Sequence, residues 1–443
     1  MDNQNEIRLI KNQIEPAELL ISHRYLRTIN FQDNELRDIQ AREVSGKAVR
    51  IIHNGRAGTA PGSVGTPLEN LLNTAKELSQ HTRPVSFKIP EGSGKTEEAY
   101  HQDPLIQNID IKIARELAER LLSRLESELP QWSLSGGITV GKAINHLVSS
   151  KGINQYFEEK ACDYYVVASL PKEGDILEVV TSRSQYPNDT MFEAFVNDLV
   201  WRAKQAEKVT HIDAGKTMLL LHPEALESIL TAFSHAIDGK AVFDKVSPLA
   251  DSIGKRIFDS RITITDDPND KTLSGYTPFG DEGTAPKRLT LVENGILKSF
   301  LTNLDYAARL KYPHTGHGSR FPGTLDEARP SGAAGIEETN TVINAGDTGF
   351  DDMLKSVTSG IYLMATWDVW SGNVISGDIS GSTHLAYRIQ NGKLAGRIKD
   401  MRFSGNIYEL LGDQLAAISK ERPDTSSCSL RAPYMLLDNV TIA

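Results

Sequence analysis

Histidine side chains offer the clearest capacity for metal or acid–base chemistry in this sequence, and 11 of them are spread along the chain. A zinc peptidase needs two histidines on one helical segment, with a glutamate beside them as general base. No histidine here begins an HExxH or HExxxH pattern. His235 lies near the end of an expected helix, where an imidazole can be a buried hydrogen-bonded group or a cation at the C-terminal end.

His314 and His317 form a second candidate, because they lie three residues apart in a glycine-rich segment. Two imidazoles at this spacing could share a metal ion or a substrate group. The sequence identifies no carboxylate or thiolate that would complete a coordination sphere. We therefore treat His235, His314 and His317 as candidate cavity residues, and we assign no metal ligand and no catalytic residue.

Other catalytic patterns are absent. The sequence has no GxSxG, and neither of its two cysteines, Cys162 and Cys428, has neighbours in sequence that would lower the pKa of its thiol. Cys162 falls in an expected strand and is interpreted as a core residue, whereas Cys428 lies in a polar loop and is expected at the surface. The segment 136–142 contains glycines and a lysine but misses the spacing of a phosphate-binding loop.

The elements that must position these side chains can be read from periodicity and turn signals. Leucines and isoleucines at every fourth residue predict a helix over 113–129, and similar patterns predict helices over 68–78, 191–206 and 223–237. Thr66 followed by Pro67 and Glu69 predicts a capping box at the start of the second of these helices. Three Asn-Gly pairs, at 54–55, 294–295 and 391–392, have apolar flanks and predict β-hairpins.

These elements indicate an α+β fold with N-terminal α/β modules containing antiparallel sheets, followed by a β-rich, largely antiparallel C-terminal domain. We place an N-terminal module at 1–86, a linker rich in Pro and Gly at 87–104, a middle α+β module at 105–210 and the β-rich domain at 211–443.

The composition limits the class of function. The 443 residues carry 48 basic and 58 acidic side chains, a formal charge of −10 that disfavours binding to nucleic acid. No apolar run reaches the length of about 18 residues that a membrane helix needs. The first residues are polar and acidic, unlike a signal peptide. We expect a cytoplasmic globular protein that has no nucleic-acid or membrane partner and no disulfide scaffold.

One long stretch carries a family resemblance. Residues 275–286 read GYTPFGDEGTAP, and residues 291–301 read LVENGILKSFL. Together they resemble the D-[DE]-G-T-P…I-E-N-G-x-L pattern of the TldD/PmbA peptidase family, with Ala285 inserted before the proline. SPLADSIG at 247–254, TGHG at 315–318 and APYMLL at 432–437 support the resemblance, which extends from about residue 17 to the end of the chain.

The family has two kinds of subunit, and the resemblance implies which kind this chain is. The TldD kind carries HExxxH just before the Ser-Pro-Leu-Ala-like stretch, and a cysteine near the C-terminus is a further zinc ligand. Here Leu230 and Thr231 fall on the first His and the Glu, and only His235 matches. Cys428 lies nearer to Ala432 than the ligand cysteine would. The pattern is similar to the PmbA (TldE) kind, which has no zinc of its own, so zinc is expected in a partner subunit.

The resemblance implies a heterodimer with a TldD-type subunit, enclosing a chamber in which the zinc subunit cuts extended or unfolded peptides, for example to remove a leader from a modified peptide. This chain would shape the chamber and hold the peptide without being catalytic by itself. Two alternatives stay open. The chain could be a stand-alone homodimeric hydrolase that uses the three histidines, or a protein that binds peptides without turnover.

Overall fold

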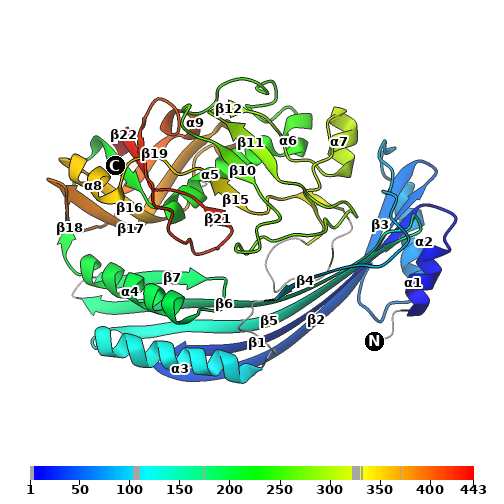
Figure 1. The fold of residues 1–443 in the computed structure, drawn as a ribbon, viewed down its shortest axis with the longest axis horizontal. Coiled ribbons are helices and arrows are strands. Elements are labelled where there is room, and N and C mark those ends of the chain that lie inside the picture. Colours follow the sequence, from blue (N-terminus) through cyan, green and yellow to red (C-terminus); the bar gives the residue numbers. More distant parts are fainter. Residues whose placement is uncertain (1–3, 103–109, 173–174, 322–329, 331–332, 370) are drawn as a thin grey trace.

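The computed structural model describes residues 4–102, 110–172, 175–321, 330, 333–369 and 371–443. These residues form a long curved sheet and a β-rich C-terminal part that lies on the concave side of the sheet (Figure 1). The combination of helices, antiparallel sheets and a β-rich C-terminal part confirms the expected α+β class.

The curved sheet has seven strands in the order β3-β2-β1-β5-β6-β4, with β7 also paired to β6. All its pairings are antiparallel except that of β4 with β6. The strands are β1 (Ala17–Gln32), β2 (Glu35–His53), β3 (Arg56–Gly62), β4 (Glu97–Gln102), β5 (Ser133–Ser149), β6 (Asn154–Lys172) and β7 (Asp175–Arg183).

Helices cover parts of this sheet. Leu117, Leu121 and Leu125 of α3 are buried against β1 and β5, which confirms the helix predicted from the four-residue repeat. The helix α4 packs against α3 and β7, and α1 and α2 cover the opposite end of the sheet (Figure 1). These helices are α1 (Gln4–Lys11), α2 (Leu68–Ser79), α3 (Ile111–Glu128) and α4 (Asp189–Ala206). None of the helices in the described ranges is long and apolar enough to cross a membrane.

The C-terminal part is built on a mixed eight-stranded sheet in the order β16-β9-β22-β19-β17-β18-β8, with β20 paired to β22. Its strands are β8 (Val209–Thr210), β9 (Gly215–Leu221), β16 (Ser359–Trp367), β17 (Asp378–Gln390), β18 (Lys393–Ile398), β19 (Arg402–Asn406), β20 (Leu415–Ile418) and β22 (Met435–Ile442). The helix α5 (Pro223–Ile237) packs on this sheet through its apolar face.

Smaller elements complete the C-terminal part. A five-stranded sheet has the order β12-β11-β10-β15-β21, and β13 pairs with β14. The strands are β10 (Ile264–Asp266), β11 (Leu289–Glu293), β12 (Ile296–Leu297), β13 (Gly318–Ser319), β14 (Gly335–Ile336), β15 (Thr341–Ile343) and β21 (Leu430–Arg431). The helices are α6 (Gly239–Phe243), α7 (Leu304–Leu310), α8 (Phe350–Ser356), α9 (Ile407–Leu410) and the 3₁₀ turn η1 (Val374–Ser376).

The local turn predictions are confirmed, with one correction. Each Asn-Gly pair has positive φ at both residues and joins two antiparallel strands, as a hairpin of this type requires. The predicted capping box at Thr66 is wrong. The helix α2 begins at Leu68, one residue later, because Pro67 takes the N-cap position, and no side chain caps it. Ser63 is the hydrogen-bond partner of the Thr66 hydroxyl instead.

The segment expected as a linker contributes a strand to the sheet. Glu97–Gln102 is β4, which pairs in parallel with residues 155–160 of β6. The strands β1 to β3 of the N-terminal module and β5 to β7 of the middle module lie in the same sheet. The two modules therefore share their backbone hydrogen bonds rather than forming separate sheets.

Buried ion pairs join the curved sheet to the C-terminal part. Arg50 of β2 donates to Glu18 of β1 at 3.1 Å and to Glu282 at 2.7 Å. Arg320 reaches Glu18 from the other side at 2.7 Å. Glu282 lies in the DEGT stretch that carries the resemblance, and its second oxygen accepts from the backbone N–H of Leu304. The most distinctive motif in the sequence thus lies at the junction of the two parts.

Candidate peptide-binding groove

The helix α5 carries the positions that match the zinc-binding motif of the TldD kind of subunit. Leu230 is buried in the core, Thr231 is partly buried, and the side chain of His235 is exposed. Leu230 and Thr231 line a cavity of about 270 Å³, whereas His235 does not. The one histidine that matches the family pattern therefore points away from this cavity.

Two partly buried carboxyl groups face the same cavity. Burial raises the pKa of Glu338 to about 7, although a hydrogen bond with Ser234 opposes the shift. Burial also raises the pKa of Glu227, against the effect of the hydrogen bond donated by Ser427. The pKa of Glu338 lies in the range where a carboxyl group can exchange protons near neutral pH.

The structure separates His314 from His317. The Nε2 of His314 lies 3.7 Å from Glu282, and its Nδ1 is 3.3 Å from the hydroxyl of Thr284. His317 is buried, with Nε2 3.0 Å from the Oδ1 of Asp266. Each imidazole thus contacts a different carboxylate. Within the described residues, no group of three or more His, Cys, Asp or Glu side chains is arranged to hold a metal ion.

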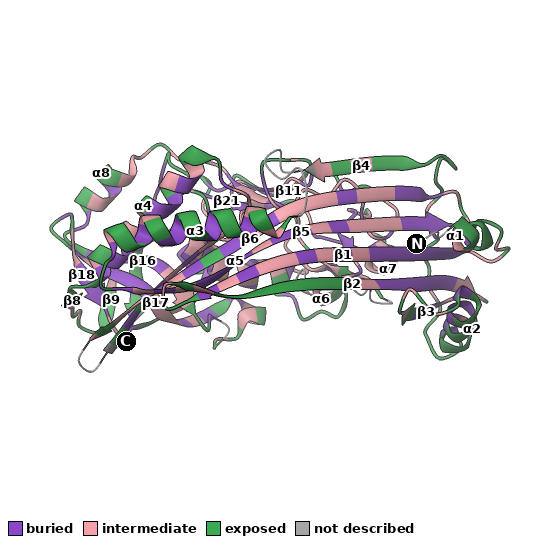
Figure 2. Cartoon of the chain, turned by 90° about the horizontal axis from the view of Figure 1, so that it is seen from below, coloured by how far each residue is buried: buried purple, intermediate pink, exposed green. Residues whose placement is uncertain are grey.

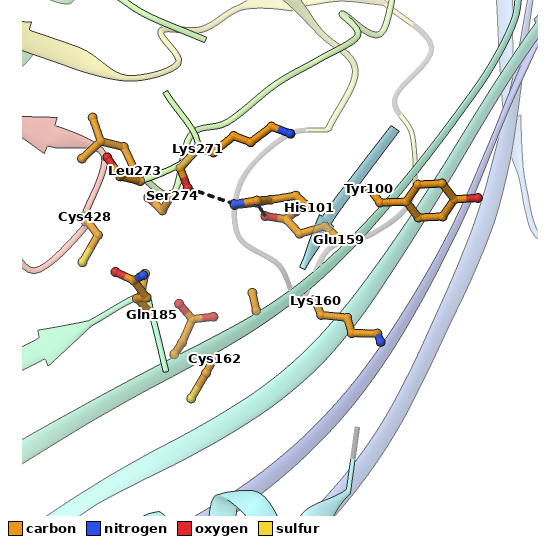
Figure 3. A pocket seen from close by; sticks show the side chains of 14 residues that line it. Tyr100, His101, Glu159, Lys160, Cys162, Gln185, Lys271, Leu273, Ser274 and Cys428 are labelled. Atoms are coloured by element: carbon orange, nitrogen blue, oxygen red, sulfur yellow. Dashed lines mark hydrogen bonds and ion pairs between the residues drawn. The ribbon is translucent and has the colours of Figure 1, made fainter. Parts of the chain in front are cut away.

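A larger cavity of about 630 Å³ lies between the curved sheet and the C-terminal part (Figure 3). Tyr100 and His101 of β4 and residues 159–163 of β6 form one wall, and residues 271–274 and Cys428 form the other. The Nε2 of His101 lies 3.3 Å from the backbone oxygen of Lys271, so this contact bridges the two walls. A hydrogen bond with Glu159 raises the pKa of His101.

The strand β6 has a break in its pairing where it lines this cavity. Its outer edge pairs with β4 over residues 155–160 and with β7 over residues 164–172. Between these pairings, no strand of the described chain pairs with residues 161–163 on that edge. Burial raises the pKa of Asp163 in this gap. A short piece of strand edge therefore lines the cavity without a neighbouring strand among the described residues.

A second cavity of about 340 Å³ adjoins the first, since Gln185, Thr272, Leu273 and Cys428 line both. We call the two cavities together the groove. Cys428 was expected in an exposed loop, but it is partly buried here because Ser274 donates to its backbone oxygen and holds the loop against the opposite wall. Burial raises the pKa of its thiol. Cys162 is fully buried, as predicted for a core strand residue.

Charged groups at the start of α5 border the groove. Arg202 of α4 donates to both oxygens of Glu224, at 2.8 and 3.1 Å. Burial alone would raise the pKa of Glu224, but the positive charge of Arg202 lowers it to about 2. Burial lowers the pKa of the N-cap residue His222 to about 4. This end of the groove is therefore held by a fixed ion pair beside a neutral imidazole.

Comparison with known proteins places this architecture in a family. Residues 17–81 match the model of PmbA/TldA metallopeptidase domain 1, and residues 214–443 match that of the PmbA/TldA metallopeptidase C-terminal domain. The chain belongs to the PmbA/TldD metallopeptidase family. The second match alone covers about half of the chain, including α5, residues 271–274 and Cys428.

Individual relatives agree with this assignment. A metalloprotease of Methanocaldococcus jannaschii is 24% identical over 408 residues, which cover 89% of this chain and 88% of the relative. A TldD homologue of Buchnera aphidicola, also described as a metalloprotease, is 30% identical over 48% of this chain and 44% of its own. The crystal structure of TldE from Thermococcus kodakarensis has the same fold, with a TM-score of 0.86, 21% identity and 99% of both chains covered.

Several site features lay beyond the sequence patterns. Glu227 and Glu338 carried no signal because isolated glutamates are common on surfaces. The gap in the edge of β6 depends on where β4 and β7 stop, and β4 was not expected at all. Only the carboxylate pair Asp281-Glu282 stood out, through the family resemblance, and the structure gives Glu282 a place in the junction between the two parts.

Proposed function

We propose that this chain is a PmbA/TldE-like subunit of a cytoplasmic peptidase complex, which holds extended peptides while a TldD-type partner with zinc cuts them in a chamber enclosed by both chains. The observation that carries this proposal is the gap in strand pairing on the edge of β6 at residues 161–163, which line the groove and have no neighbouring strand on that edge among the described residues.

An extended peptide can bind to such an edge by adding a strand, because its main chain supplies hydrogen bonds whatever its sequence. Three residues of strand span about 10 Å, so the gap accepts only a short stretch in one pass. The groove continues past Gln185 and Leu273 towards α5, which gives the peptide a path beyond the gap. The groove therefore favours unfolded chains over folded proteins, whose strands are already paired.

The side chains on α5 support a role without zinc in this subunit. An aliphatic group at Leu230 cannot bind zinc, and the hydroxyl of Thr231 cannot act as a carboxylate base at neutral pH. The cavity beside them is lined by hydroxyl groups, apolar side chains and the carboxyls of Glu227 and Glu338. Peptide hydrolysis in the complex would then depend on the partner subunit.

Cleavage of an unfolded test peptide, measured with this chain alone, with a TldD-type relative alone and with both, tests the proposal. We expect zinc-dependent cleavage that requires the relative and increases when this chain is added. Cleavage by this chain alone, or stoichiometric zinc that survives dialysis against a chelator, would contradict it.

Binding in the groove can be tested separately with Gln185→Trp, which places a large ring where the two cavities join. We expect at least tenfold weaker binding of a fluorescent unfolded peptide. The matched control is Gln80→Trp, at an exposed position after α2, which should bind like the original protein. Equal peptide binding by both variants would show that the peptide binds outside the groove.

One observation favours the alternative of a stand-alone hydrolase. The pKa of Glu338 is about 7, which suits a general acid or base near neutral pH. This alternative predicts peptide cleavage by the isolated chain and its loss in Glu338→Gln, without the need for a partner.

A further inference from the structure

The strand β4 covers the edge of β6 beside the groove, yet none of its side chains that the structure describes is buried. Figure 2 shows β4 at the border of the curved sheet, exposed over most of its length. Its sequence, EEAYHQ, lacks the β-branched residues that favour strands. Its pairing with β6 is parallel, which is slightly less stable per residue than antiparallel pairing. Such a strand belongs to the parts of a fold that open most easily.

The strand β7 borders the same gap from the other side and is held more firmly. Leu177 and Val179 are fully buried in the core that the sheet forms with α3 and α4, and Thr181 is also buried. β7 pairs antiparallel with β6 over residues 164–172. Displacing β7 would expose its apolar side chains to water, whereas the described part of β4 has no buried side chain to expose. A peptide that extends along this edge from the gap would therefore displace β4.

His101, near the end of β4, joins this strand to the opposite wall of the groove. Its Nδ1 lies 3.5 Å from the Oε1 of Glu159 on β6, and its Nε2 lies 3.3 Å from the backbone oxygen of Lys271. The centroid of its ring lies 4.9 Å from that of Tyr276. These contacts hold the end of β4 that lies beside the gap. Their loss would free β4 first at the end from which a peptide would extend.

The strand edge that β4 covers has the length that an extended peptide needs. The gap at residues 161–163 spans only about 10 Å. Residues 155–160 of β6, which pair with β4, continue this edge directly. Without β4, residues 155–163 would offer about 30 Å of strand edge. The larger cavity lies against residues 159–163, so a peptide bound along this edge would lie partly in the groove.

We propose that the outer edge of β6 over residues 155–163 is the peptide-binding site of the groove, and that β4 is an internal occupant of this edge, which an extended peptide displaces and replaces. The main chain of the peptide would then pair with β6 as β4 does in its absence. This inference rests on the proposed function and deepens it, because it identifies the edge to which the peptide binds. It also gives β4 a regulatory role, since the apparent affinity falls with the fraction of chains in which the edge is free.

Hydrogen exchange of the unmodified chain gives the first test. Saturation with the fluorescent unfolded peptide used for Gln185→Trp should make the backbone amides of residues 97–102 exchange at least about threefold faster, because β4 loses its pairing with β6. The amides of residues 155–163 should exchange no faster than before, since the peptide replaces β4. Unchanged or slower exchange of residues 97–102 in the peptide complex would overturn the proposal.

A reversible cross-link between β4 and β6 gives the decisive test. Ala99 and Phe157 lie directly opposite each other in the two strands. Neighbouring strands are about 4.8 Å apart, a separation that a disulfide can bridge, so Ala99→Cys/Phe157→Cys should join the strands on mild oxidation. We expect at least about tenfold weaker peptide binding in the oxidised protein and full recovery on reduction. The single variants Ala99→Cys and Phe157→Cys are the controls, and oxidation should not change their binding.

The outcomes separate this inference from the proposed function. Equal binding by the oxidised and reduced double variant, with the disulfide confirmed by mass spectrometry, would overturn the displacement of β4 but leave peptide binding in the groove intact. Absence of peptide binding in both states and in the original chain would contradict the proposed function, and this inference with it.

The contacts of His101 provide an independent measure. His101→Ala removes the contacts that join β4 to the opposite wall, so we expect about three- to tenfold tighter peptide binding because the edge of β6 is free more often. The matched control is His81→Ala, at an exposed position after α2, which should bind like the original protein. Weaker binding by His101→Ala would show that His101 holds the peptide rather than β4, and would count against the proposal.

Discussion

Carboxylates in two interior regions of this molecule have opposite surroundings. At the junction of the two parts, Glu18 and Glu282 are fully buried and each accepts from an arginine. Beside α5, Glu227 and Glu338 accept from the hydroxyl groups of Ser427 and Thr341, and no ion pair joins them to a cation within the described residues.

This difference in surroundings changes the pKa of the carboxyl groups in the two regions. Burial alone would raise the pKa of Glu282, but Arg50, His314 and the N–H of Leu304 lower it to about 2. Burial raises the pKa of Glu338 to about 7, because hydroxyl groups compensate the lost hydration less well than a cation does. The junction is thus permanently charged and holds the fold together, whereas the cavity beside α5 gains or loses a proton near neutral pH.

The largest effect is expected when the cation is removed from the junction. Arg50→Met leaves Glu18 and Glu282 without their shared partner, which should lower the free energy of unfolding by about 3–5 kcal/mol. Urea denaturation at pH 7, followed by circular dichroism, measures this change. A loss below about 1 kcal/mol would show that the junction tolerates uncompensated charge and would remove the contrast between the regions.

Acid should weaken the junction through Glu282. Its pKa is lower in the folded protein than its ordinary value of 4.5, so its contribution is complete above about pH 5 and is lost as the pH falls towards 2. Glu282→Gln should therefore be less stable than the original protein by about 3 kcal/mol at pH 7. The difference should shrink between pH 5 and pH 3, and a difference independent of pH would contradict the assignment.

Ionisation of Glu338 in the cavity beside α5 should change the stability of the protein with pH in the opposite direction. The pKa of Glu338 is higher in the folded protein, so its ionisation opposes folding increasingly from pH 4.5 to pH 7. Glu338→Gln should be more stable than the original protein at pH 8, by up to about 3 kcal/mol, and equal to it near pH 4.5. The control Glu293→Gln, at an exposed site on β11, should show no such dependence on pH.

The smallest effect is expected for an exposed pair. Arg115 and Glu119 of α3 lie 2.7 Å apart, but both side chains are at least half exposed. Arg115→Met should change the free energy of unfolding by less than about 0.5 kcal/mol in the same urea experiment, because solvent screens such pairs. A change as large as that in Arg50→Met would mean that burial is not what separates these two arginines.

Local features of the fold were predictable because neighbouring residues determine them. The Asn-Gly hairpins need positive φ, which asparagine and glycine adopt readily, and the four-residue repeat of α3 fixes its buried face. The predicted start of α2 was one residue too early. Proline can occupy either the N-cap or the first helical position, and sequence alone does not distinguish them.

The candidate site was less predictable because its parts meet only in the folded chain. Arg50 and Glu282 are 232 residues apart in sequence, and no periodicity links them. The strand β4 follows a segment that contains several glycines and prolines, and it forms through its pairing with β6 rather than through its own pattern. His235 matched the family motif in sequence, yet the turn of α5 directs its side chain to solvent.

The buried ion pairs of Arg50 with Glu282 and of Arg320 with Glu18 limit how far the C-terminal part can move away from the curved sheet. Movement of the C-terminal part away from the sheet would separate Arg50 from Glu282 and Arg320 from Glu18, and buried charges that lose their partners are costly. A large hinge rotation of the C-terminal part relative to the curved sheet is therefore disfavoured. If the groove binds peptides as we propose, a peptide would enter lengthwise from one end, so the length of its unfolded tail, more than its overall size, would decide whether it binds.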